Sequence, residues 1–233
     1  SEAIIMSEIG KFLMNGSLYR GIKPVMWSPV EKTALAEAEI EYHNHISTTI
    51  FARFPIVKTS LDIISDFEII IWTTTPWTMP GNRAVAYGKD IDYSLIEVTN
   101  VGENSLAKIG DKIIIAKELV EDVMKEISVL SFNSSNTLKG SDFAGTVLAH
   151  PLNNNGYEHE VLLLEAEFVT TDQGTGFVHI APGHGADDFE LGRQNNLPIP
   201  ETVSDNGILN SDLPLLGGLR VLKDNEIIAD IMS

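Results

Sequence analysis

Apolar residues follow two rhythms along the chain, and the rhythm of strands is the more frequent. Short apolar runs predict buried strands at 67–71, 83–87, 93–98, 112–115, 160–164 and 177–180. Helical spacing of apolar residues predicts helices at 4–13, 117–127 and 224–232. Because helices do not alternate regularly with strands, the pattern argues against parallel βαβ units. We therefore predict a mixed α/β, strand-rich fold with a β-barrel core and peripheral helices.

Two further segments are less clear. Residues 36–42 have the Ala and Glu content of a helix, but they alternate strictly as A-E-A-E-I-E-Y. We give the alternation more weight and predict a strand that turns at His43–His45 and pairs with 47–54 as a hairpin. Residues 131–146 are polar and rich in Gly, which predicts a loop.

The segment 72–82 reads WTTTPWTMPGN and follows the predicted strand at 67–71. It brings three hydroxyl groups, those of Thr73–Thr75, to a strand end. Pro76 and Pro80 predict an extended, stiff peptide after them. No His or carboxylate lies within the segment, so a Thr nucleophile would need a base from elsewhere. On composition alone, the threonines are strand formers, and Trp72 and Trp77 are core aromatics.

A second segment, 172–192, reads DQGTGFVHIAPGHGADDFELG and gathers two His, three Asp and five Gly around a short strand. Its GTGFVH part lacks the third Gly of a dinucleotide fingerprint, and a strand follows where a helix should begin. Asp187, with Glu190 three residues later, predicts a capped helix start. Asp188 would then lie in the first turn, where the helix dipole favours an ionised carboxylate.

Together these segments resemble the editing domain of isoleucyl-tRNA synthetase, a large insertion in the catalytic domain of that class I enzyme. WTTTPWTMPGN is close to the family's WTTTPWTLPxN, and GTGFVHIAPGHGADD is close to its GTGxVHxAPxxGxDD. KPVMWSP at 23–29 and TALAEAEIEY at 33–42 also match. The valyl and leucyl enzymes carry Arg where this chain has Thr75. The resemblance implies the β-barrel editing fold as a single domain, 1–233, with 1–30 and 218–233 connecting to the catalytic domain.

The resemblance also implies the activity, which is hydrolysis of the ester of misacylated Val-tRNA(Ile), with Ile rejected by pocket size. Asp188 would bind the ammonium group, and His179 would lie beside the amino-acid side chain and the terminal ribose. Thr73 and Thr74 would assist the reaction. The implied substrate contacts are Thr75, Trp72, Trp77 and Asn82. No residue is an evident strong base, which favours water attack assisted by the neighbouring ribose hydroxyl; the use of His184 stays open.

The net charge of the chain limits how it can bind tRNA. With 16 basic and 33 acidic residues, the formal charge is −17, so the chain is a poor binder of a tRNA body. The resemblance resolves this: the domain would receive only the aminoacylated 3′ end and its valine moiety, while the rest of the synthetase chain holds the tRNA. Editing would need no cofactor, since ATP and Mg²⁺ serve the catalytic domain, whose nucleotide motifs are absent here.

The remaining features of the composition are those of an intracellular protein. The chain has no Cys, which excludes disulfides and thiolate metal sites. Glu2 and Glu8 interrupt the N-terminal apolar run, and no run is long enough for a membrane span. We expect a cytoplasmic protein that binds no membrane.

Two alternatives stay open. The first is a metal-dependent hydrolase of a small ester or amide that uses His179, His184 and Asp188, although their spacing matches no recognised zinc motif and we expect no metal. The second is a module that binds the tRNA end without catalysis. Sensitivity to a chelator would distinguish the metal-dependent hydrolase from the editing domain. Binding without turnover would distinguish the non-catalytic module from it.

Overall fold

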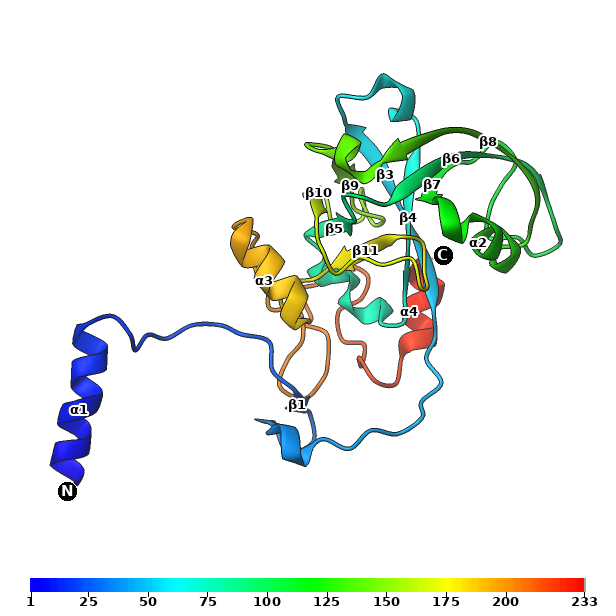
Figure 1. Ribbon diagram of the computed structural model, residues 1–233. Helices are drawn as coiled ribbons and strands as arrows, with labels where there is room; N and C mark the ends of the chain where they lie inside the picture. Colours follow the sequence, from blue (N-terminus) through cyan, green and yellow to red (C-terminus); the bar gives the residue numbers. More distant parts are fainter. Residues whose placement is uncertain (233) are drawn as a thin grey trace.

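The computed structural model describes residues 1–232, and a nine-stranded mixed sheet forms its body (Figure 1). The order of the strands is β11-β5-β10-β9-β3-β4-β7-β6-β8. Two neighbouring pairs are parallel, β10 with β5 and β4 with β7. The strands are β3 (Ile50–Lys58), β4 (Glu68–Thr73), β5 (Ala84–Tyr87), β6 (Asp92–Val101), β7 (Lys112–Ala116), β8 (Val129–Lys139), β9 (Val147–Ala149), β10 (Glu160–Glu165) and β11 (Phe177–Ile180). The predicted strand-rich α/β class is confirmed.

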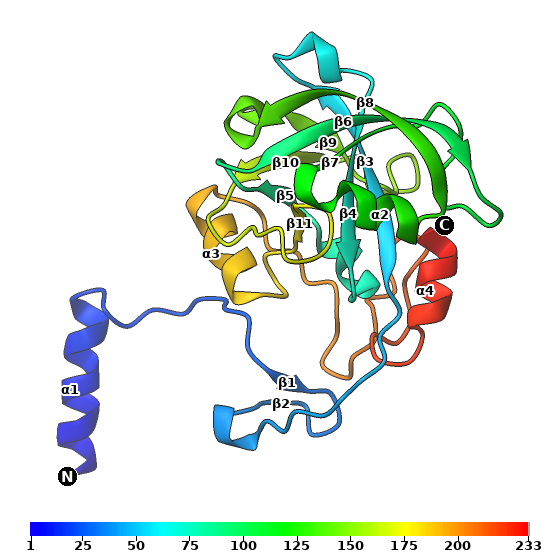
Figure 2. The same ribbon diagram turned by 45° about the vertical axis from the view of Figure 1, so that its right-hand side comes forward.

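The sheet curls so that its first strand meets its middle. β11 contacts β4, although four strands stand between them in the order and no hydrogen-bonded ladder joins them within residues 1–232 (Figure 2). The six strands from β11 to β4 therefore wrap around one apolar core. Fully buried members of this core are Phe54, Ile69, Ile71, Val85, Leu148 and Val161. The curl is what brings the carboxyl end of β4 close to β11.

Four α-helices lie outside the sheet. They are α1 (Glu2–Met14), α2 (Val120–Glu126), α3 (Ala186–Gln194) and α4 (Asn225–Met232). The apolar spacing predicted α1, α2 and α4 to within a few residues, and the capping pattern predicted the start of α3. The first helix stands apart from the body with none of its residues buried, beyond a small hairpin of β1 (Trp27–Ser28) and β2 (Thr33–Ala34) (Figure 1). None of the helices in residues 1–232 has the length and apolar composition that a membrane span requires. The division into one domain with connecting segments stays a prediction.

The predicted hairpin of 36–42 with 47–54 is wrong. Residues Glu37–Glu39 form a 3-10 turn, and β3 pairs with β4 and β9 instead. A carboxylate oxygen of Glu39 accepts the backbone N–H of Ala36 at 2.8 Å, so a local bond replaces a ladder. Alternation predicts a strand only where one face is buried, and nearly every side chain of 36–42 is exposed.

The predicted loop at 131–146 is also wrong over its first half. β8 pairs with β6 along most of its length and forms the edge of the sheet. Its side chains are mostly exposed, with only Val129 buried. Polar side chains on an edge strand discourage pairing with another chain. Because β8 is polar, it lacks the apolar run from which a strand is predicted.

Candidate functional site

A cavity of about 240 Å³ opens where the end of β4, the turn after it, β11 and the start of α3 meet. β11 lies between α3 and β4 in both views (Figures 1 and 2). The side chains that line the cavity are Trp72, Thr73, Thr75, Thr78, Val178, His179, Ala181, His184 and Asp188. The two segments singled out in the sequence, about a hundred residues apart, thus form one site.

Two of the three threonines face this cavity. The backbone N–H of Thr75 donates to Oγ1 of Thr73 at 3.1 Å, and the two hydroxyl oxygens are 3.3 Å apart. This short turn at the end of β4 places both hydroxyls on the same side. Thr74 is exposed and does not line the cavity, so the structure does not bring its hydroxyl to the site.

The two prolines predicted an extended peptide after Thr75, and this prediction is wrong. Pro76–Gly81 form a 3-10 helix. Pro76 occupies its first position, where a missing N–H leaves no hydrogen bond unmade and the fixed φ suits a helical start. The turn reverses the chain and directs Thr78 and Asn82 toward β11.

His179 is a buried side chain of the cavity wall. It is 9% exposed and bonded at both ring nitrogens: Nε2 lies 2.8 Å from Oγ1 of Thr78, and Nδ1 lies 2.7 Å from Nδ2 of Asn82. Burial, with smaller contributions from His150 and His184, lowers the pKa of His179 to about 3. The ring is therefore neutral near pH 7, and neither nitrogen is free to bind a metal or take a proton.

Asn82 lies behind His179, not in the cavity. It is completely buried, and its Nδ2 also donates to the carbonyl of Ala84 at 2.8 Å. Its Oδ1 is buried with no hydrogen-bond partner in residues 1–232. Asn82 is not among the residues that line the cavity, and its contact with His179 links it to the cavity wall, so a direct contact between Asn82 and substrate stays a prediction.

Asp188 reaches the cavity from the first turn of α3. Its Oδ2 accepts the backbone N–H of Ala181 at 3.1 Å. A Cβ on Gly185 would lie 2.8 Å from Oδ1 of Asp188, so glycine is needed there for the carboxylate to fit. Burial raises the pKa of Asp188 above its ordinary value, against the lowering effect of backbone N–H groups. Burial thus outweighs the favourable backbone N–H groups at this position, and a bound cation would favour the ionised form of Asp188.

The prediction that Asp187 caps α3 is wrong. The N-cap is Gly185, in extended conformation (φ −154°, ψ 151°), and no side chain caps the helix. Asp187 is exposed at the second position of the helix and does not line the cavity. The Asp pair thus divides, with one carboxylate at the site and one on the surface.

His184 lies in the cavity wall, which the sequence left open. Its Nε2 is 2.8 Å from Oγ1 of the buried Thr202, and its ring meets Trp77 edge to face at 5.2 Å. Burial lowers the pKa of His184.

Trp77 packs with the C-terminal segment and does not line the cavity, whereas Trp72 does. Thr78, Val178 and Ala181 were missed as site residues, although all three lie inside the two motifs.

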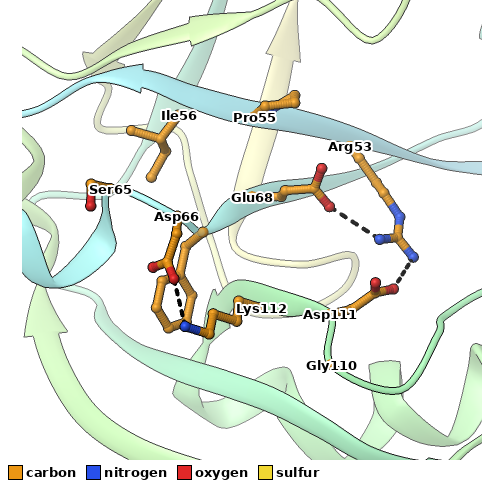
Figure 3. Close-up of a pocket in the computed structure, with 10 residues that line it drawn as sticks. Arg53, Pro55, Ile56, Ser65, Asp66, Glu68, Gly110, Asp111 and Lys112 are labelled. Carbon is orange, nitrogen blue, oxygen red and sulfur yellow. Dashed lines mark hydrogen bonds and ion pairs between the residues drawn. The ribbon is translucent and has the colours of Figure 1, made fainter.

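A second, larger cavity of about 500 Å³ lies beside β3, β4 and β7 (Figure 3). The guanidinium of Arg53 bridges Glu68 at 3.1 Å and Asp111 at 2.6 Å. Lys112 pairs with Asp66 at its other end. Each charged side chain that lines this cavity thus has a partner of opposite charge, which leaves no evident group to receive a ligand.

No cluster of three or more His, Cys, Asp or Glu side chains in residues 1–232 is arranged to hold a metal ion. His179, His184 and Asp188 share a cavity, but both nitrogens of His179 are already bonded. The trio is therefore a poor ligand set as it stands.

The sequence of the chain is similar to that of known tRNA synthetases. A family model described as class I tRNA synthetases (I, L, M and V) matches residues 1–185. The chain is 51% identical to an isoleucine–tRNA ligase of Gluconobacter oxydans, over 100% of this chain and 24% of that protein. It is 46% identical to one of Pelagibacter ubique, over 99% and 25%. The chain thus spans about a quarter of the length of these relatives.

Among solved structures, the chain resembles one described as the crystal structure of GlLeuRS-CP1, with a TM-score of 0.57. The match covers 79% of this chain and 95% of the other, at 13% sequence identity. At that identity the likeness concerns the fold alone.

Proposed function

Because the chain belongs to the class I tRNA synthetases of the isoleucine, leucine, methionine and valine group, we propose that it hydrolyses the aminoacyl ester of a misacylated tRNA. The substrate is Val-tRNA(Ile), and the reaction is post-transfer editing. One observation carries the proposal: a single small cavity joins the carboxylate of Asp188, the neutral imidazole of His179 and the hydroxyls of Thr73 and Thr75. A wrongly attached amino acid presents an ammonium, a side chain and an ester, and each has a matching group there.

Asp188 binds the ammonium group. Its carboxylate is half-buried, and its Oδ2 accepts the backbone N–H of Ala181. Burial disfavours the ionised carboxylate, and the positive charge of an incoming ammonium offsets that effect. The ion pair then forms in a place that is partly shielded from water.

His179 sets the size of the side-chain pocket. Its ring is neutral and fixed, so it meets an apolar side chain without a charge to desolvate. Valine and isoleucine differ by one methylene, a difference that binding alone discriminates weakly, for which isoleucyl-tRNA synthetase is the standard example. A second site that admits valine and stops the longer side chain at His179 removes the error.

The hydroxyls of Thr73 and Thr75 orient the ester, the terminal adenosine or the attacking water. His179 is bonded at both nitrogens and Asp188 binds the ammonium, so neither of these two residues acts as a free base toward the hydroxyls. The ribose hydroxyl beside the ester therefore assists the attack of water, and the protein contributes position and polar stabilisation.

The rest of the synthetase holds the tRNA body in the cytoplasm, where the reaction takes place. A chain of formal charge −17 attracts phosphates poorly, so only the 3′ end enters the cavity. The proposal needs no cofactor for editing.

The test is deacylation of Val-tRNA(Ile) by a full-length isoleucyl-tRNA synthetase that carries this chain as its insertion. We expect release of valine, unchanged by EDTA when Mg²⁺ is restored for the tRNA. Loss of activity that zinc alone restores would favour a metal-dependent hydrolase. Binding of the aminoacylated end without release of valine would favour a docking module.

A further inference from the structure

His179 sits between two residues of the threonine-containing turn, and their hydrogen bonds define the state of its ring. Thr78 has one hydroxyl hydrogen, which it donates to the carbonyl of Thr75 at 2.8 Å. Toward His179, 2.8 Å away at Nε2, the same oxygen can therefore only accept. Nε2 must carry the ring proton.

Asn82 imposes the same state from the other side. Its Nδ2 lies 2.8 Å from the carbonyl oxygen of Ala84, so the amide must present its N–H₂ and not its oxygen there. The same nitrogen lies 2.7 Å from Nδ1 of His179. Asn82 therefore donates to Nδ1, which must be unprotonated.

The arrangement leaves Asn82 with an unsatisfied group. Its Oδ1 is fully buried and has no hydrogen-bond partner within residues 1–232. Buried polar atoms without partners are rare and destabilise a fold, so each needs an explanation. The two donations from Nδ2, to Ala84 and to His179, supply that explanation.

From these contacts we propose that Thr78 and Asn82 are positioning residues that hold His179 as the neutral tautomer protonated at Nε2. The proposal deepens the proposed editing function, on which it rests. The tautomer fixes the plane of the ring and keeps it uncharged and non-basic. His179 then acts as a rigid wall and not as an acid or a base, which a side-chain sieve requires.

The shared position of the two residues adds to this conclusion. Both belong to one short turn, since Thr78 lies within the 3-10 helix and Asn82 follows it as the C-cap. Both reach the same ring on β11, across 101 and 97 residues of sequence. The turn therefore sets the placement of the wall as well as that of the Thr73 and Thr75 hydroxyls.

The first test is the ring state of His179, observed by long-range ¹H–¹⁵N NMR of the 233-residue chain, which needs no substrate. We expect protonated Nε2 and bare Nδ1, unchanged between pH 5 and 8. His150 is an internal reference, because its Nε2 faces the carbonyl of Met79 and its Nδ1 faces the N–H of Leu152. A proton on Nδ1 of His179, or a ring that titrates in this range, would overturn the proposal.

Variants separate positioning from simple packing. Thr78→Val keeps the shape and removes the hydroxyl, whereas Thr78→Ser keeps the hydroxyl. We expect Thr78→Val to broaden the Nε2–H signal and Thr78→Ser to preserve it. Asn82→Asp should move the ring proton to Nδ1, because a carboxylate can only accept. Asn225→Asp is its control, since Asn225 also has a buried, unpartnered Oδ1 but lies on α4.

The second test is selectivity in the full-length synthetase. Thr78→Val should raise the rate on Ile-tRNA relative to Val-tRNA by about three-fold or more, within the limit of about 10–200-fold that one methylene allows. Thr78→Ser should restore the wild-type ratio. A Thr78→Val enzyme with both the wild-type ratio and the wild-type Nε2–H signal would contradict the proposal. Absence of any deacylation in the wild type would count against editing alone, because the NMR result judges the tautomer separately.

Discussion

Two cavities of this protein differ in a way that size does not explain. The larger one, about 500 Å³, is lined by charged side chains that neutralise one another (Figure 3). The smaller one, about 240 Å³, has a half-buried carboxylate whose pKa burial raises, and a histidine whose pKa burial lowers to about 3. The charges of the larger cavity are neutralised within the fold, whereas groups with shifted pKa values in a cleft are typical of functional sites.

The cavities also differ in how they are built. Arg53 and its partners belong to neighbouring strands of one sheet, β3, β4 and the turn before β7, so their pairing follows from the strand register. The threonine cavity instead joins a strand end, a 3-10 turn and a helix start from distant segments. Such an assembly of loops on a rigid sheet is the usual position of a functional site.

The largest expected effect separates the Asp pair of the small cavity. Asp188→Ala removes the partner of the ammonium, and loss of one member of a partly buried charge pair costs about 2–5 kcal/mol. We expect kcat/KM for Val-tRNA(Ile) to fall by about 30-fold or more. Asp187→Ala is the matched control, which should keep activity and lose about 0.3–1 kcal/mol of stability at the first turn of α3. The reverse pattern of activities would exchange the roles of the two residues.

The next effect concerns selectivity. His179→Ala removes the wall, so the longer side chain should enter, and the ratio of rates on Ile-tRNA and Val-tRNA should rise by about ten-fold or more. Both rates are measured in the full-length synthetase. An equal decrease of both rates would instead identify His179 as a ribose or water contact and place the sieve elsewhere.

Acid should affect the buried histidines and the larger cavity in separate pH ranges. Burial lowers the pKa of His179 to about 3 and that of His150 to about 4, so below pH 6.5 the unfolded chain binds protons that the folded chain refuses. Stability should fall as pH drops from 6.5 to 4, by about 1.4 kcal/mol per pH unit for each histidine. Urea denaturation at several pH values measures the slope, and His179→Gln should reduce it. An unchanged slope would show that His179 ionises freely in the fold.

The larger cavity should respond only below that range. Burial opposes ionisation of Asp111, but hydrogen bonds from Arg53 and the backbone of Lys108 outweigh it and lower the pKa of Asp111. Its stabilising contribution is present above the ordinary pKa of 3.8 and is lost as pH falls through the lower folded value.

The smallest effect tests whether the larger cavity is only structural. Arg53→Met leaves Glu68 and Asp111 without their cation, which should lower stability by about 1–2 kcal/mol, less than for a fully buried pair because Arg53 is partly exposed. Deacylation should not change. Lys112→Met, at the more exposed pair with Asp66, should have a smaller effect on stability. A loss of editing in Arg53→Met at unchanged stability would give this cavity a function.

The sequence by itself identified most of the strands and the two segments that form the site. Strands such as β4, β7 and β11 were predictable because long-range pairing and local preference agree there: their residues are apolar, β-branched and buried. The polar edge strand β8 was missed because most of its side chains are exposed to water. Residues 36–42 were misread because their alternation is not matched by a partner strand.

Only the tertiary structure decided which side chains of the two segments meet. Thr74 and Asp187 carry the same chemical groups as their neighbours Thr73 and Asp188, yet they point to solvent. Thr78 and Asn82 gain their roles from a ring that is 101 and 97 residues away. Composition and periodicity report local preference and burial, but hydrogen bonds between distant segments depend on how the sheet curls. The sequence determined the chemistry of this site, and the curl of the sheet determined its geometry.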